Sequence, residues 1–153
     1  MKKLSIFVLI IMCLFITGCG EPKEKKVTTL SNFNSILVGK NFNVKDNMEE
    51  YTDVNYISGS KKATYGDIEI EMVKYTDVES AKKVQDAQIE SFNLLKSTGA
   101  FEDKIKGNNY YKYILVSNGR YMVSTRVEDT LVFCKTLLQN KELVETIYNE
   151  LGY

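Results

Sequence analysis

Apolar and polar residues alternate most regularly over residues 110–127, which read YYKYILVSNGRYMVSTRV. Two runs rich in aromatic and β-branched residues flank Asn118-Gly119. This dipeptide strongly favours a two-residue hairpin turn, because both turn positions need a positive φ. Such a turn places Ser117 opposite Arg120 and so sets the register of the hairpin. The pattern therefore predicts two antiparallel strands.

The predicted register divides the side chains of this hairpin between two faces. The first face is mainly apolar and carries Tyr110, Ile114, Val116, Tyr121, Val123 and Val127. The second face carries Tyr111, Tyr113, Leu115, Arg120, Met122 and Arg126. Glu128-Asp129 indicates another turn, into a third strand over residues 130–137. If that turn also has two residues, Cys134 lies on the first face and Phe133 on the second, whereas a one-residue change swaps them.

A second stretch with a period of two lies between Val54 and Tyr75. Three apolar residues alternate there with three carboxylates, namely Ile68, Ile70 and Met72 with Asp67, Glu69 and Glu71. This predicts a half-buried strand with one wet face, near the lysines at positions 61 and 62. Tyr65-Gly66 predicts the turn from a partner strand, in which Gly59 indicates a bulge. Residues 42–44 are expected to form a brief extended piece.

Helical spacing of apolar residues predicts three helices. The first covers residues 29–38, with Gly39 at its C-terminal cap. The second begins at the capping box formed by Thr76 and Glu79 and runs to about Thr98. Its apolar face holds Val78, Ala81, Val84, Phe92 and Leu95, with Gln88 as a partly buried amide. The third is capped by Asn140, ends at Gly152 and buries Leu143, Val144, Ile147, Tyr148 and Leu151.

The order of these elements predicts an α+β fold. It reads helix, two strands, helix, three strands, helix, so a strand pair followed by a helix occurs twice. We expect an antiparallel sheet of about five strands with the helices packed on one face. The chain of 153 residues is long enough for one such domain, which we place at residues 28–153.

The N-terminal segment, MKKLSIFVLIIMCLFITGC, has the layout of an export signal. Lys2 and Lys3 precede thirteen almost wholly apolar residues, Leu4 to Ile16. A membrane-spanning helix needs about 20 apolar residues, so an ordinary transmembrane anchor is disfavoured and a signal peptide is favoured. Residues 20–27, GEPKEKKV, are polar and are expected to be a flexible tether.

Ile16-Thr17-Gly18-Cys19 resembles a lipobox, the motif that signal peptidase II reads in bacterial lipoproteins. The resemblance implies that residues 1–18 are removed and that Cys19 receives a diacylglyceryl group. It also implies a position on the extracytoplasmic face of the cell membrane. In layout the whole chain is similar to small lipoproteins of Gram-positive, clostridial-type bacteria. Beyond the lipobox this similarity implies no binding residue.

Composition narrows the chemistry further. The chain has no histidine, which excludes Ser-His-Asp and Cys-His nucleophile systems and histidine-ligated zinc. Without Lys2 and Lys3, 18 of the 20 basic residues remain against 20 acidic ones. A net charge of −2 gives no nucleic-acid footprint. Cys134 is then the free thiol of the domain and is expected to be buried and inert in an apolar strand.

Two groups of residues are candidates for chemistry. The carboxylates at positions 67, 69 and 71 are expected to form a solvated row paired with lysines, because a straight row does not converge on a metal ion. The proposed ligand-binding residues are Tyr111, Tyr113, Arg120, Met122 and Arg126. Arginine and tyrosine are enriched in recognition sites, so an exposed second hairpin face would suit an anionic or peptide ligand. The alternative is an ordinary outer sheet face stabilised by cross-strand pairs.

Together these features predict a lipid-anchored, non-enzymatic module that binds an envelope protein or an anionic ligand and needs no cofactor or metal. One alternative is an accessory subunit of a membrane complex, which predicts a contiguous apolar patch. Another is a carboxylate-based hydrolase, which predicts a cleft where two titratable groups converge.

Overall fold

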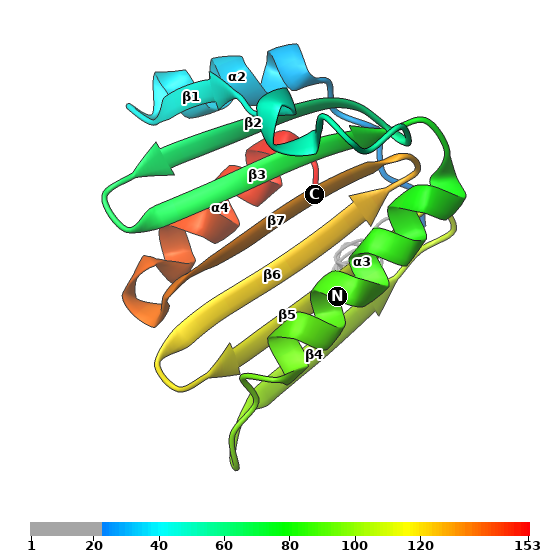
Figure 1. Cartoon of the computed structure of the whole chain (residues 1–153). Coiled ribbons are helices and arrows are strands. Elements are labelled where there is room, and N and C mark those ends of the chain that lie inside the picture. Colours follow the sequence, from blue (N-terminus) through cyan, green and yellow to red (C-terminus); the bar gives the residue numbers. More distant parts are fainter. Residues whose placement is uncertain (1–22) are drawn as a thin grey trace, which may run out of the picture.

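A seven-stranded antiparallel sheet forms the centre of the molecule in the computed structural model, which describes residues 23–153 (Figure 1). The strands are β1 (Asn43–Asp46), β2 (Ile57–Tyr65), β3 (Ile68–Tyr75), β4 (Phe101–Lys106), β5 (Tyr110–Ser117), β6 (Arg120–Val127) and β7 (Thr130–Leu137). The helices are α2 (Leu30–Gly39), α3 (Val78–Asn93) and α4 (Lys141–Leu151). The strand order across the sheet is β1-β2-β3-β7-β6-β5-β4.

The α+β class is confirmed, but the expected number of about five strands is wrong. The two additional strands, β1 and β4, are the edges of the sheet. Edge strands have one neighbour and little apolar cover, so their side chains are mostly polar and partly exposed. The sequence FEDKIK of β4 therefore lacks the apolar alternation that marks the inner strands.

The predicted hairpin is confirmed residue by residue. Ser117 pairs with Arg120 and Tyr110 with Val127, while Asn118 and Gly119 both have a positive φ. The following turn also has two residues, and Cys134 accordingly pairs with Val123. The bulge is confirmed as well, since the register of β2 shifts between Ile57 and Gly59.

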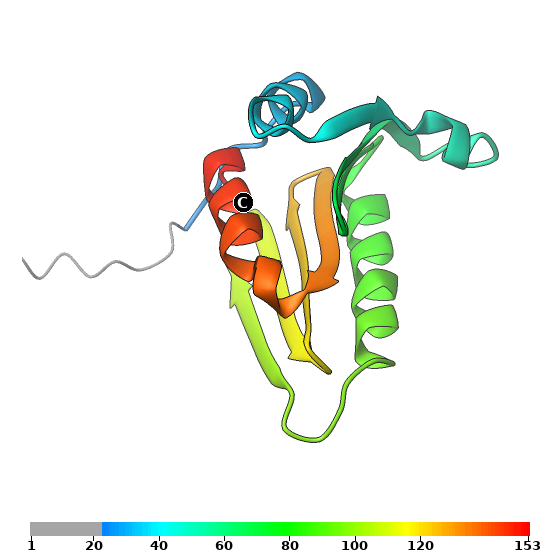
Figure 2. The ribbon, with the colours of Figure 1, turned by 90° about the vertical axis from the view of Figure 1, so that its left-hand side faces the viewer.

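The helices cover both faces of the sheet, which contradicts the prediction that they share one. Figure 2 shows α4 on one side of the sheet and α3 on the other. The largest core lies on the α2 and α4 side and includes Phe33, Ile70 and Val123. On the opposite side, Phe92 of α3 packs on the sheet with Tyr113, Leu115 and Met122. The apolar stripe of a helix shows which side of the helix is buried. It does not show which face of the sheet the helix covers.

Both ends of α3 differ from the prediction. Asp77, not Thr76, is the N-cap, and its carboxylate accepts a hydrogen bond from the backbone N–H of Ser80 at 2.8 Å. The helix ends at Asn93, five residues before Thr98. Beyond it, the hydroxyl of Ser117 donates to the carbonyl of Leu95 and accepts from the N–H of Ser97, both at 2.9 Å. A residue in the distant hairpin thus fixes the chain where the helix stops.

Within the segment expected to be a flexible tether, Lys23 and Lys25 are hydrogen-bonded to the domain. The side chain of Asn109 accepts from the N–H of Lys25 at 2.9 Å and donates to its carbonyl at 2.8 Å. The N–H of Asn108 donates to the carbonyl of Lys23 at 2.7 Å. The predicted signal peptide and Cys19 lie outside the described residues. Within residues 23–153, no helix is long and apolar enough to span a membrane.

Candidate functional site

α3 covers the middle of the face that was expected to be exposed. Tyr113 and Met122 are completely buried in the cluster around Phe92. The hydroxyl of Tyr113 donates to the side-chain oxygen of Asn93 at 2.7 Å. These two predicted ligand-binding residues therefore hold α3 on the sheet and do not form a surface.

The two arginines of the predicted surface are not brought together. Arg120 lies exposed beside the hairpin turn. Arg126 lies on the same strand face six residues away, a separation of about 20 Å along a strand, and is only 9% exposed. Tyr111 remains partly exposed near Arg126. Of the five predicted ligand-binding residues, Tyr111 and Arg126 therefore lie near each other. Tyr113, Arg120 and Met122 are not part of this group.

Arg126 and Tyr111 line a cavity of about 380 Å³ between the first half of α3 and the edge of the sheet at β4 and β5. The remaining lining residues are Lys82, Gln85, Asp86, Lys106, Gly107, Asn108 and Tyr110. Three cationic side chains therefore face one carboxylate. We call this space the Arg126 cavity.

The guanidinium of Arg126 has few partners within residues 23–153. Its Nη1 donates to the backbone carbonyl of Glu128 at 3.2 Å. Its Nε is buried without a hydrogen-bond partner, and no carboxylate of a described residue lies within 4 Å of the guanidinium. Burial lowers the pKa of Arg126, against the opposing effect of Glu128 and Asp86. An arginine carries five N–H donors, so most of them remain open to a ligand or to water.

Gln85 fixes the helical wall of this cavity. Its amide is 2% exposed and donates to the carbonyls of Tyr111 at 2.9 Å and Ser124 at 3.3 Å. The predicted partly buried amide at Gln88 is confirmed, whereas the more deeply buried Gln85, three residues earlier, was not predicted. Helical spacing identifies the face that meets the sheet, but the exact rotation of α3 depends on where the sheet surface lies.

Gly107 fixes the opposite wall. A Cβ at this position would come within 2.8 Å of the carbonyl oxygen of Lys23 and would overlap the ring of Tyr110. Only glycine therefore allows the β4–β5 loop to approach both the start of the described chain and this ring.

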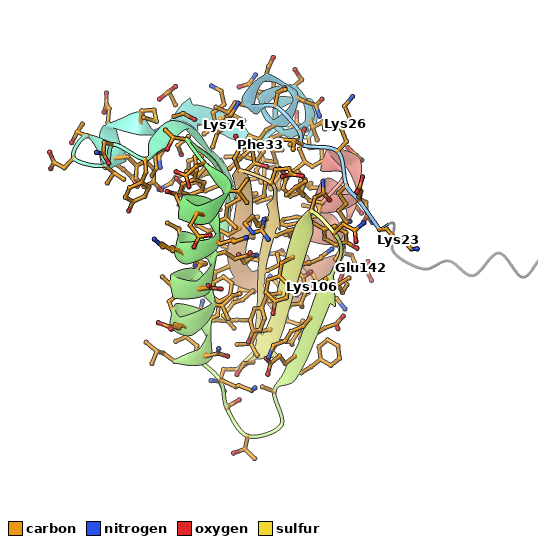
Figure 3. All side chains as sticks on the ribbon, turned by 90° about the vertical axis from the view of Figure 1, so that its right-hand side faces the viewer. Lys23, Lys26, Phe33, Lys74, Lys106 and Glu142 are labelled. Atoms are coloured by element: carbon orange, nitrogen blue, oxygen red, sulfur yellow. The ribbon has the colours of Figure 1, made fainter. Side chains whose placement is uncertain are left out.

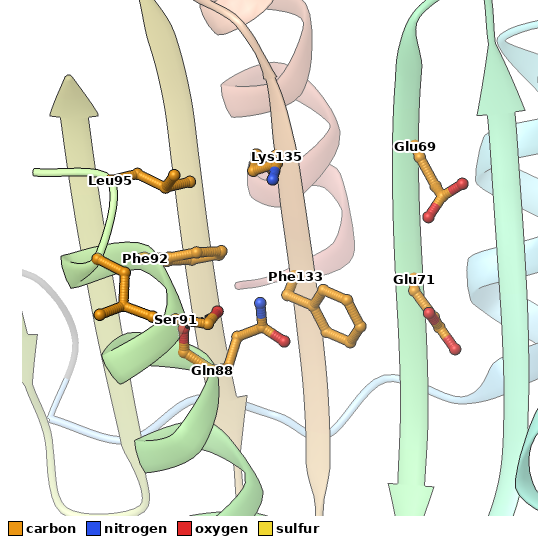
Figure 4. Close-up of a pocket in the computed structure, with 9 residues that line it drawn as sticks. Glu69, Glu71, Gln88, Ser91, Phe92, Leu95, Phe133 and Lys135 are labelled. Atoms are coloured by element: carbon orange, nitrogen blue, oxygen red, sulfur yellow. Dashed lines mark hydrogen bonds between the residues drawn. The ribbon is translucent and has the colours of Figure 1, made fainter. Parts of the chain in front are cut away.

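A second cavity, of about 370 Å³, lies between the C-terminal half of α3 and strands β3 and β7 (Figure 4). Its floor carries Glu69, Glu71, Phe133 and Lys135. The expected solvated acidic row is wrong at Glu71, which is 4% exposed. Its Oε1 accepts from three side chains, Asn47 and Tyr51 at 2.7 Å and Ser60 at 2.9 Å.

The expectation that lysine lies near the acidic row is confirmed at Lys62. Its Nζ lies 3.7 Å from Glu69 and 4.0 Å from Oε2 of Glu71. Burial and the Glu71 carboxylate raise the pKa of Tyr51, so this phenol stays protonated and acts as a donor. Glu71 is therefore a hydrogen-bonded structural carboxylate.

Cys134 is buried, as expected, with 1% exposure. Burial raises the pKa of its thiol to about 12, with a smaller contribution from Glu69. At neutral pH the thiol is therefore protonated and inert as a nucleophile. Within residues 23–153 no three acidic or cysteine side chains are grouped so that they could hold a metal ion.

Comparison with known proteins gives one similarity. No protein-family model and no curated protein matches the chain. A solved structure described as a GTP binding regulator from Thermotoga maritima is 20% identical, with a TM-score of 0.49. The match covers 85% of this chain and 93% of the Thermotoga chain.

Proposed function

We propose that the chain is a lipid-anchored, non-enzymatic module on the extracytoplasmic face of the cell membrane that binds an anionic ligand in the Arg126 cavity. The observation that carries the binding proposal is the state of Arg126. Its side chain is nine-tenths buried, faces no carboxylate within 4 Å among the described residues, and keeps its Nε unpaired.

Burying a cation with no carboxylate in direct contact is unfavourable by several kcal/mol, and Glu128 and Asp86 act on Arg126 only from beyond 4 Å. An anion in the cavity would supply the missing charge and acceptors. Guanidinium groups bind carboxylates and phosphates through paired hydrogen bonds, so either group suits the site. Lys82 and Lys106, both exposed on the cavity lining, would add attraction at its mouth.

The anchoring proposal rests on the lipobox, Ile16-Thr17-Gly18-Cys19. The test is mass spectrometry of the protein extracted from membranes. We expect an N-terminus at Cys19 that carries a diacylglyceryl group. A full-length Met1 form recovered without lipid would contradict the anchor while leaving the cavity proposal intact.

The binding proposal is tested by titrating the full acylated protein in detergent with inorganic phosphate at constant ionic strength. We expect saturable binding by calorimetry, accompanied by a rise in Tm. Arg126→Gln should abolish both effects. Arg120→Gln is the matched control, because Arg120 is the other arginine of the same strand and lies outside the cavity. Equal phosphate binding by the two variants would overturn the proposal.

An accessory subunit of a membrane complex is a second candidate, supported by exposed apolar residues near the β5–β6 turn. Leu94 is 87% and Phe101 58% exposed, and Leu137, paired with Arg120, is 42% exposed. The test is co-purification after mild detergent extraction. Loss of a membrane protein partner in Leu94→Ser with Phe101→Ser, but not in Arg126→Gln, would favour this candidate.

A further inference from the structure

We infer that the edge of the domain made by residues 23–27 and the β4–β5 loop faces an anionic bilayer, and that the anion in the Arg126 cavity is a lipid headgroup phosphate. This inference rests on the function proposed above. It names the source of the anion and the orientation of the domain. Residues 23–27 with residues 106–109 are called the anchor edge below.

The first step is the attachment of the chain start to this loop. Three backbone groups at two positions are held, because Asn108 binds the carbonyl of Lys23 and Asn109 binds both the N–H and the carbonyl of Lys25. Thr28, a few residues on, is 7% exposed. The chain therefore leaves the domain at one defined point, beside residues 107–109.

The second step is the short distance left to the lipid. Only residues 20–22 separate Cys19 from Lys23. Four extended Cα–Cα steps span at most about 14 Å. A lipid on Cys19 begins at the headgroup level, so the anchor edge lies within that distance of the bilayer surface. A tether that was free up to residue 27 would allow twice the reach.

The third step is the excess of basic residues along the anchor edge and the adjoining Arg126 cavity. Its basic residues are Lys23, Lys25, Lys26, Lys82, Lys106 and Arg126, and its acidic residues are Glu24, Asp86 and Glu128, whose N–H binds the carbonyl of Asn109. Figure 3 shows Lys23, Lys26 and Lys106 on the same side of the molecule. Basic side chains held near anionic headgroups are attracted to them within a Debye length. The whole mature chain is slightly acidic, so this local excess is not a reflection of overall composition.

The fourth step is that the anchor edge and the Arg126 cavity share residues. Lys106, Gly107 and Asn108 line the cavity, and Asn108 also binds Lys23. A headgroup at this edge is therefore next to the cavity that holds the unpaired guanidinium. Phosphatidylglycerol and free phosphate both present unesterified phosphate oxygens that a guanidinium can bind, but only the lipid is brought there by the anchor.

The test is lysine footprinting of the full acylated protein in vesicles of phosphatidylcholine alone or mixed with phosphatidylglycerol. An amine-reactive acetylating reagent is applied, and modified lysines are quantified by mass spectrometry. We expect the reactivity of Lys23, Lys26 and Lys106 to fall about threefold on the anionic vesicles. Lys45 is the internal control, because β1 is the opposite sheet edge, six strand spacings or about 29 Å from β4.

Arg126→Gln should reduce the protection of Lys106 on anionic vesicles, whereas Arg120→Gln should leave it unchanged. Equal reactivity of the three lysines on both vesicle types would overturn the inference. If phosphate binding in detergent survives in that case, the cavity takes a soluble anion and the proposed function stands. Loss of phosphate binding together with equal reactivity would remove both.

Discussion

Arg126 and Glu71 are two buried charged residues with opposite surroundings. Glu71 accepts three hydrogen bonds from neighbouring side chains, whereas Arg126 has a single backbone acceptor within the described chain. A buried charge whose hydrogen bonds are satisfied helps to hold its neighbours in place. A buried charge whose hydrogen bonds are not satisfied lowers the stability of the fold. The two residues therefore predict opposite effects of substitution.

Replacing Arg126 by methionine should stabilise the ligand-free protein. The variant keeps the apolar stem and removes the unpaired charge, so the free energy of unfolding should rise by about 1–2 kcal/mol. Urea denaturation with and without phosphate measures this. A destabilised variant would show that the arginine serves the fold.

Replacing Glu71 by alanine should destabilise the protein by about 3 kcal/mol, because Asn47, Tyr51 and Ser60 lose their acceptor inside the protein. Glu69→Ala, on the same strand face but exposed, should change stability by less than about 0.5 kcal/mol. Equal effects in urea denaturation would contradict the distinction between the two carboxylates.

The Cys134 thiol predicts a pH dependence of stability. Its pKa rises from 9.0 to about 12 on folding, so above pH 9 the unfolded chain loses this proton first. Stability that is complete below pH 9 should then fall, by at most about 1.4 kcal/mol per pH unit. Cys134→Val should show a shallower fall between about pH 9 and pH 12. Identical slopes for the two proteins would refute this contribution.

At the level of elements, the inner strands of the sheet could be predicted from the sequence, whereas the edge strands could not. The β5–β6–β7 register followed from Asn118-Gly119 and one further two-residue turn, which are local features. The edge strand β4 and the end of α3 depend on partners far away in sequence, such as Ser117. The sequence predicted two residues of the Arg126 cavity, Arg126 and Tyr111. It did not predict Gln85 and Gly107, because their roles depend on how α3 and the β4–β5 loop pack against the sheet.

The attachment of residues 23–27 to the β4–β5 loop predicts a protease-resistant chain start. Asn109→Ala removes two hydrogen bonds to Lys25, so trypsin should cleave after Lys23, Lys25 or Lys26 about tenfold faster. Asn108→Ala is the matched control, because its backbone N–H still binds Lys23 and the variant loses only a 3.4 Å hydrogen bond to the side chain of Glu24. Equal cleavage rates, measured by mass spectrometry, would show that the side chain of Asn109 does not hold this segment.

At the level of the whole molecule, a helix layer, the sheet and a second helix layer produce two ends with different surfaces. The end at residues 106–109 is cationic and binds the start of the described chain. The end at the β5–β6 turn carries exposed Leu94 and Phe101. The sequence alone did not separate these ends, because their residues come from several distant segments.

The proposed anchor predicts the fate of a Cys19→Ser variant in fractionated cells. Without the acyl acceptor the precursor should keep residues 1–18, and its mass should correspond to the unprocessed chain. Pulse–chase labelling followed by mass spectrometry measures both. Normal processing of this variant would contradict lipid attachment at Cys19.

The hydrogen-bonded chain start limits how far the domain could extend from a membrane to which Cys19 is attached. Under the proposed anchoring, at most about 14 Å of chain and strands about 27 Å long would keep the far end of the domain within roughly 40 Å of the membrane. The domain could not contact molecules that lie farther from the membrane than this. Under the proposed anchoring, a partner that contacts Leu94 and Phe101 would lie within that same distance of the bilayer.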